Sequence, residues 1–167
     1  MIVATMGGVT VGLLLLSRFL IRWYPGVGSI RNSPQDAIVG LIPFAFGWAY
    51  GALATLSVAG LIGWLFDAVL WVSNWLGDAA LWIGVGADAG VSSRGNYLPL
   101  TTQGTAMVLL LTGIVLAVIK FRKCGPDVKT GVWCGACLGT SAGIAGLTAV
   151  PLAQAANWLG ETVYGAL

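Results

Sequence analysis

The sequence has no histidine and very little charge, since only 8% of its 167 residues are Asp, Glu, Lys or Arg. Without histidine, the chain lacks the residue used most often as a general base and as a metal ligand. A soluble domain carries about 25% charged residues, so a chain that is 57% hydrophobic cannot cover a globular surface in water. The composition therefore predicts an all-α, polytopic membrane helical bundle that forms one domain over residues 1–167.

Groups for catalysis are also scarce. Cys134 and Cys137 form a Cys-x-x-Cys pair inside an uncharged run, where small buried packing residues fit better than a redox motif. Cys124 falls in a basic segment that we assign to the reducing cytoplasm, so no disulfide is expected there. No charged residue lies near the middle of the second, third or fourth apolar run. We predict no catalytic residue, no metal and no cofactor other than bound phospholipid.

Apolar runs predict four helices, each at least as long as the roughly 20 residues that a crossing requires. The predicted helices cover residues 2–24, 37–83, 102–121 and 130–160. A polar loop over 84–101 and a basic loop over 120–129 separate the later ones. The second helix, if continuous, would be roughly 70 Å long at 1.5 Å per residue.

Tryptophans form a stripe on the second predicted helix, within about 40° on a helical wheel. The stripe consists of Trp64, Trp71, Trp75 and Trp82. Asp67, Asn74 and Asp78 form a narrow polar stripe beside it. Two interpretations fit this pattern: a helix at the membrane–water boundary, or a core face buried in an oligomer.

Glycines recur every four residues in the last apolar run. This spacing places them on one helix face and allows a neighbouring backbone to approach closely. The predicted helix-packing glycines are Gly131, Gly135, Gly139 and Gly143, with Gly47 and Gly51 showing the same spacing in the second helix. We expect these faces to join copies of the chain into a homo-oligomer or filament.

Basic residues gather in two places that four crossings would bring to one side. Arg18 and Arg22 lie near the end of the first helix and Arg31 follows it, while Lys120, Arg122, Lys123 and Lys129 lie in the basic loop. The positive-inside rule makes this side cytoplasmic and both termini external. The basic loop either sets the topology alone or also binds anionic lipid head groups. With a net charge of +2, we predict no direct contact with nucleic acid.

The segment 102–160, two apolar helices joined by a short basic turn, resembles the conjugative pilins of type IV secretion systems. The resemblance implies insertion in the inner membrane, assembly into a filament with bound lipid, and partners among other secretion-system membrane proteins. It also implies that Lys120, Arg122, Lys123 and Lys129 meet lipid head groups or line a lumen.

The leading hypothesis is a non-enzymatic protein of the bacterial inner membrane that self-assembles through its glycine-rich helix faces. It would be a pilin-like or structural subunit of a conjugation or type IV secretion assembly. The alternatives are a holin-like pore former and an accessory subunit of a larger membrane complex.

Overall fold

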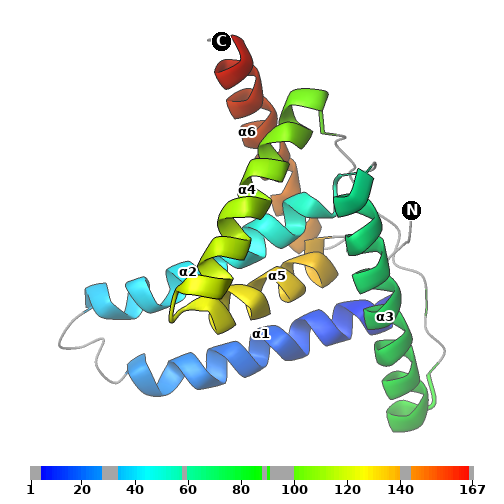
Figure 1. Cartoon of the computed structure of the whole chain (residues 1–167). Coiled ribbons are helices and arrows are strands. Elements are labelled where there is room, and N and C mark those ends of the chain that lie inside the picture. The colour runs from blue at the N-terminus through cyan, green and yellow to red at the C-terminus, as the bar shows by residue number, and fades with distance from the viewer. Residues whose placement is uncertain are drawn as a thin grey trace.

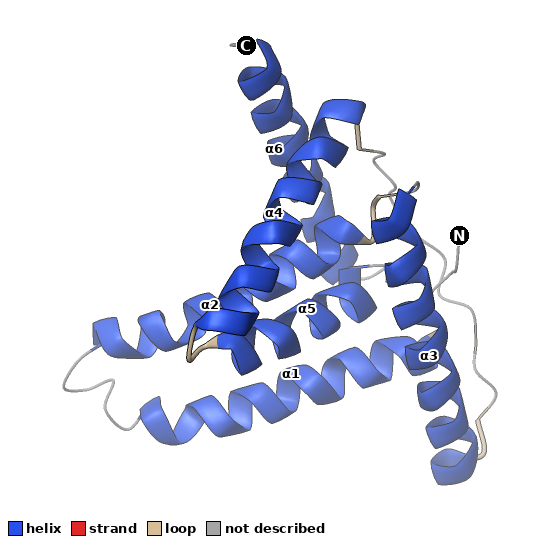
Figure 2. Ribbon diagram, viewed as in Figure 1, coloured by secondary structure: helices blue, strands red, loops and turns tan. Residues whose placement is uncertain are grey.

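The computed structural model describes residues 5–27, 34–57, 60–87, 90, 100–139 and 144–165. Within these ranges the chain forms six helices and no β-strand, which confirms the prediction of an all-α bundle (Figures 1 and 2). The helices are α1 (Met6–Val27), α2 (Pro34–Ala54), α3 (Gly60–Val85), α4 (Thr102–Phe121), α5 (Gly125–Gly139) and α6 (Ile144–Gly165).

The prediction of one long helix over 37–83 is wrong, because the chain breaks between α2 and α3. The last turn of α2 tightens, with the amide of Leu56 donating to the Leu53 carbonyl at 3.0 Å and that of Ser57 to Ala54 at 3.2 Å. Such i to i−3 bonds are typical of a helix end. Gly60 then takes a φ of +89°, which a continuous right-handed helix cannot contain.

The predicted helix over 130–160 is also divided, since α5 ends at Gly139 and α6 begins at Ile144. The basic loop predicted over 120–129 is shorter than expected. Lys120 belongs to the last turn of α4 and Lys129 to α5, so only residues 122–124 lie between the two helices.

Helices α1, α2 and α5 lie side by side and form a layer, visible in Figure 1. The ring of Phe19 stacks on that of Phe44 with centroids 3.9 Å apart, and the Cys134 thiol donates to the Gly12 carbonyl at 3.4 Å. These contacts make α1 antiparallel to α2 and α5, which run parallel to each other.

Helices α4 and α6 pair with each other and cross this layer (Figure 1). Asn157 of α6 accepts a hydrogen bond from the Thr101 amide at 3.0 Å. The hydroxyl of Thr101 in turn caps α4 by accepting from the Gly104 amide at 3.1 Å. A hydrogen bond of 2.8 Å between the hydroxyls of Tyr50 and Thr112 ties α4 to the layer.

Helix α3 lies crosswise to α1, at the end of the layer where α1 begins (Figure 2). Its inward face is buried and includes Phe66, Leu70 and Ser73. Three helices, α1 over Met6–Tyr24, α3 and α4, are long and apolar enough to cross a membrane, and α2 contains a shorter apolar stretch, Ile38–Ala54. These helices support the prediction of a membrane protein.

Candidate functional site

The most extensive helix contact among the described residues lies between α2 and α5, and glycines bring the two backbones close together along it. A Cβ atom placed on Gly131 would collide with the Phe44 carbonyl oxygen, and one on Gly135 with that of Trp48. Both partners are backbone atoms of α2, which cannot swing away as a side-chain end can. The two helices therefore pack backbone to backbone, which side chains of any size would prevent.

The α2 side of this contact is built in the same way. A Cβ atom on Gly47 would collide with the Val128 carbonyl oxygen, and one on Gly51 with that of Val132. At the far end, a Cβ atom on Gly139 would lie 2.8 Å from the Cα atom of Ala52. We call this contact the glycine seam, made of Gly47, Gly51, Gly131, Gly135 and Gly139.

The glycine seam joins two parts of one chain. Each glycine face is covered by the other, so the expectation that these faces join separate copies does not match the described structure. Assembly of copies would have to use another surface. Gly143, the sixth predicted packing glycine, lies outside the described residues.

The two cysteines of α5 are buried beside the seam. Cys134 and Cys137 are both inaccessible to solvent, and neither forms a disulfide. Their position fits the predicted packing role.

The tryptophan stripe faces outward. Its four side chains are 61–71% exposed, so within one chain they do not form a buried core. The polar stripe beside it has partners. The Asp78 carboxylate accepts from the Thr5 hydroxyl at 2.7 Å, and the Asn74 side-chain oxygen accepts from the Thr5 amide at 3.2 Å.

Sequence reasoning grouped Asn74 and Asp78 but missed Thr5 as their partner. Two polar residues four positions apart in an apolar helix indicate that another polar group forms hydrogen bonds with them, because burying them without partners costs free energy. The sequence does not say which group does so.

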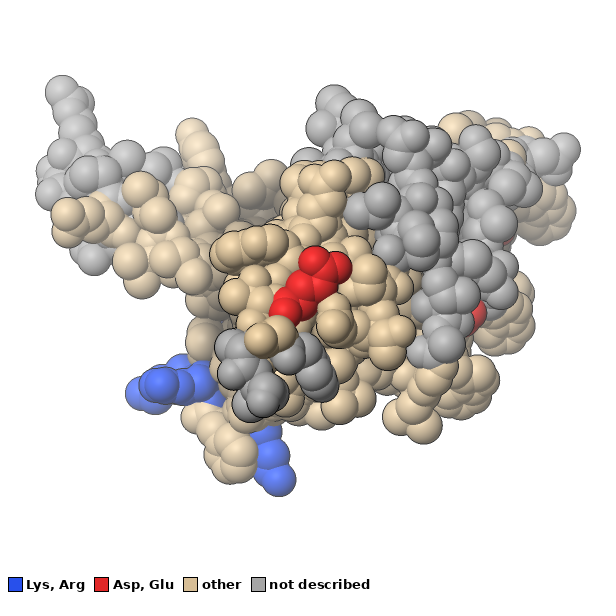
Figure 3. Space-filling model, turned by 90° about the horizontal axis from the view of Figure 1, so that it is seen from above, with Lys and Arg blue, Asp and Glu red and all other residues tan. Residues whose placement is uncertain are grey.

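Basic side chains gather where α1 ends, α2 begins, and α4 turns into α5. Trp23 lies beside Gly40 there, and Gly125 packs on the Ile119 backbone. All six described Lys and Arg residues are exposed and belong to these segments; they are Arg18, Arg22, Lys120, Arg122, Lys123 and Lys129. We call this region the cationic end. Figure 3, seen from above, shows basic side chains grouped at one side.

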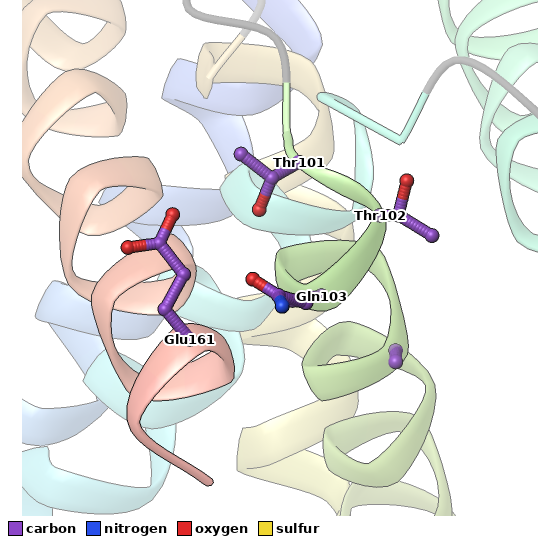
Figure 4. Close-up of a pocket in the computed structure, with 5 residues that line it drawn as sticks. Thr101, Thr102, Gln103 and Glu161 are labelled. Carbon is purple, nitrogen blue, oxygen red and sulfur yellow. The ribbon is translucent and has the colours of Figure 1, made fainter. Parts of the chain in front are cut away.

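An open groove of about 490 Å³ lies between the first turn of α4 and the last turns of α6. The groove is lined by Thr101, Thr102, Gln103 and Glu161. Figure 4 shows the Gln103 side chain extending from α4 in the direction of α6, which carries Glu161. The carboxylate, the amide and the hydroxyls can form hydrogen bonds with a polar ligand. Among the residues that were described, no three His, Cys, Asp or Glu side chains group as metal ligands do.

Comparisons with protein-family models, with curated proteins and with solved structures found no match.

The two asparagine contacts give a local prediction. We expect Asn74→Ala to speed amide exchange at Thr5, because the amide loses its acceptor, while the Thr101 amide keeps its wild-type rate. Asn157→Ala should do the reverse. An intramolecular hydrogen bond contributes about 1 kcal/mol, or roughly fivefold in exchange rate. Hydrogen exchange followed by mass spectrometry in detergent measures both sites, and equal changes at the two sites in either variant would contradict the assignment.

Proposed function

We propose that this chain is a non-enzymatic, multi-pass protein of the bacterial inner membrane that serves as a structural subunit of a membrane assembly. The observation that carries the proposal is the cationic end. Six exposed cations gather at this end of the layer, and Asp127 is the acidic residue of α5 beside them. Because Lys and Arg are retained on the cytoplasmic side, this end would face the cytoplasm.

The cationic end also offers a binding surface for lipid. Each exposed Lys or Arg near an anionic surface contributes about 1 kcal/mol of attraction. Lys120, Arg122 and Lys123 lie together at the turn between α4 and α5. We therefore infer that phospholipid head groups bind there, in keeping with the lipid-bound role that the pilin resemblance implies for these residues.

Assembly would use an apolar surface outside the glycine seam. Helix α4 offers one, with exposed side chains at Leu109, Leu110, Ile114 and Leu116. We propose that copies of the chain, or a partner in a conjugation or secretion complex, pack on this face. The glycine seam would make each copy a rigid unit.

The native Cys124 tests the membrane orientation. It lies in the turn at the cationic end and is partly exposed, whereas Cys134 and Cys137 are buried. We expect the protein to stay in membranes washed with alkaline carbonate, and we expect a membrane-impermeant maleimide to label Cys124 only after the inner membrane is opened. Release by carbonate, or labelling of Cys124 in intact spheroplasts, would contradict the proposal. Assembly is tested separately by mass in lipid nanodiscs, where a monomer alone would refute it.

A further inference from the structure

Helix α3 has 26 residues, enough to cross a bilayer. Its connections, however, place both of its halves at the same end of the layer. It follows the end of α2, which runs away from the cationic end. Its second half holds Thr5, at the start of α1, through Asn74 and Asp78. The start of α1 is the end farthest from the cationic end, and Figure 1 shows α3 lying crosswise there.

The surface of α3 is divided into four sides, read at 100° per residue. One side is buried against the bundle and includes Phe66, Leu70 and Gly77. Next to it comes the polar stripe, about 40° wide on the wheel. The tryptophan stripe follows, also about 40° wide. The last side is an exposed aliphatic stripe of Leu61, Leu65, Val72, Leu76 and Ile83.

This order of sides matches a helix that lies in a membrane–water boundary. Such a helix turns polar groups to water and aliphatic groups to acyl chains, and tryptophan prefers the head-group level between them. In α3 the tryptophan stripe does lie between the polar and the aliphatic stripes. The bundle covers the remaining side, and it also buries Asn74 at the inner edge of the polar stripe, where the start of α1 takes the place of water.

Contacts within the chain orient the polar stripe away from the cationic end and the aliphatic stripe toward it. The polar stripe meets the start of α1, away from the cationic end. Leu65 of the aliphatic stripe instead lines an apolar cavity of about 170 Å³, whose other walls include Ile119 of α4 and Lys129 of the cationic end. At Leu65 the aliphatic stripe thus faces along the layer, toward what would be the membrane interior.

We propose that α3 does not cross the membrane but lies in its plane, in the leaflet opposite the cationic end. Its ligand is the phospholipid of that leaflet, with the tryptophan stripe at the head groups. This inference rests on the proposed membrane function, because it takes the cationic end as one face of the bilayer.

Spin-label depth measurements test the proposal directly. Trp64 and Trp82 are 18 positions apart, or about 27 Å along a helix. On a Cys124→Ser background, nitroxides at Trp64, Trp71 and Trp82 should report depths that agree within about 5 Å, the radius of a helix. A crossing helix would instead place Trp71 about 10 Å deeper than Trp64, with Trp82 in the opposite leaflet. That result would overturn the proposal.

Reference positions separate this test from the proposed function. Labels at Leu13 and Leu14, two exposed positions on α1, should report a lipid environment whether or not α3 lies in the plane. If these labels are in water, the membrane function fails. If they are in lipid while the tryptophan positions differ in depth, only the in-plane assignment fails. Labels at Leu65 and Leu76 should lie deeper than those at the tryptophans, and the reverse order would also overturn it.

Accessibility gives an independent measurement on the same background. Gly84 has open space around its Cα atom, and Asp67 lies in the polar stripe, so cysteine fits at both positions. We expect an impermeant maleimide to label Asp67→Cys and Gly84→Cys from the same side of the membrane, opposite to the side from which it labels Cys124 in the wild type. Labelling of the two from opposite sides would mean that α3 crosses.

Discussion

Gly135→Leu should prevent the chain from reaching its folded state. The first added carbon atom would already collide with the Trp48 carbonyl oxygen, and an isobutyl group would force α2 and α5 apart along the whole glycine seam. Overpacking of a core costs about 1–3 kcal/mol even where side chains can adjust. Here the obstacle is backbone, and the total stability of a protein is only about 5–15 kcal/mol. We therefore expect loss of most of the folded population.

The buried cysteines of α5 report the outcome at the seam itself. Cys134 and Cys137 are inaccessible in the folded chain. In mild detergent, a maleimide should label them slowly in the wild type and rapidly in Gly135→Leu. Gly135→Ala should fall between the two, because its Cβ atom makes the same collision without the rest of the side chain.

Gly113→Leu is the matched control. Gly113 lies on an exposed face of α4, and a Cβ atom there would meet nothing within 4 Å. Replacing an unneeded helical glycine improves helix propensity by up to about 1 kcal/mol. Labelling of Cys134 and Cys137 in Gly113→Leu should therefore be as slow as in the wild type. Equal protection in Gly135→Leu would show that the seam is not a close contact.

Reversal of the four charges at the α4–α5 turn should change the membrane orientation of this region. The variant combines Lys120→Glu, Arg122→Glu, Lys123→Glu and Lys129→Glu. Because acidic residues contribute little to orientation, the change removes the retention signal of this turn. We expect Cys124 to become accessible to an impermeant maleimide in intact spheroplasts, in at least a tenfold larger fraction of molecules, equivalent to about 1.4 kcal/mol.

The control for this experiment keeps the charge and changes the side chain. Lys120→Arg, Lys123→Arg and Lys129→Arg together should leave Cys124 protected, because orientation depends on positive charge near the helix ends. If the charge-reversed variant is as protected as this control, Arg18 and Arg22 suffice to orient the chain. The turn would then have no topogenic role.

The helical class of the fold could be predicted because it depends on composition alone. A segment without charged side chains is stable in lipid only if its backbone N–H and C=O groups bond to each other. A helix achieves this within one segment. The break between α2 and α3 was missed because residues 55–60 contain neither proline nor charge. Hydropathy therefore continues through the break. The signal that could have marked it is Thr55 and Ser57 followed by Gly60, since hydroxyl side chains and glycine are common at helix ends.

The glycine seam shows a second limit of sequence reasoning. A four-residue glycine spacing identifies which helix face can be approached closely, but not which helix approaches it. Gly47 and Gly51 show the same spacing as Gly131 and Gly135, yet nothing local indicates that the two sets meet within one chain. The cationic end was easier to anticipate, because alternating crossings bring Arg18 and Lys120 to one side whatever the packing.

The parallel pairing of α2 with α5 also has a consequence for the order of synthesis. Roughly 80 residues separate the two halves of the seam, and at about 5–20 residues per second the ribosome needs roughly 4–16 s to make them. During that interval α2 is in the bilayer, and its glycine face at Gly47 and Gly51 has not yet met α5. Lipid or an earlier helix of the same chain would contact this face until α5 is synthesised and replaces it.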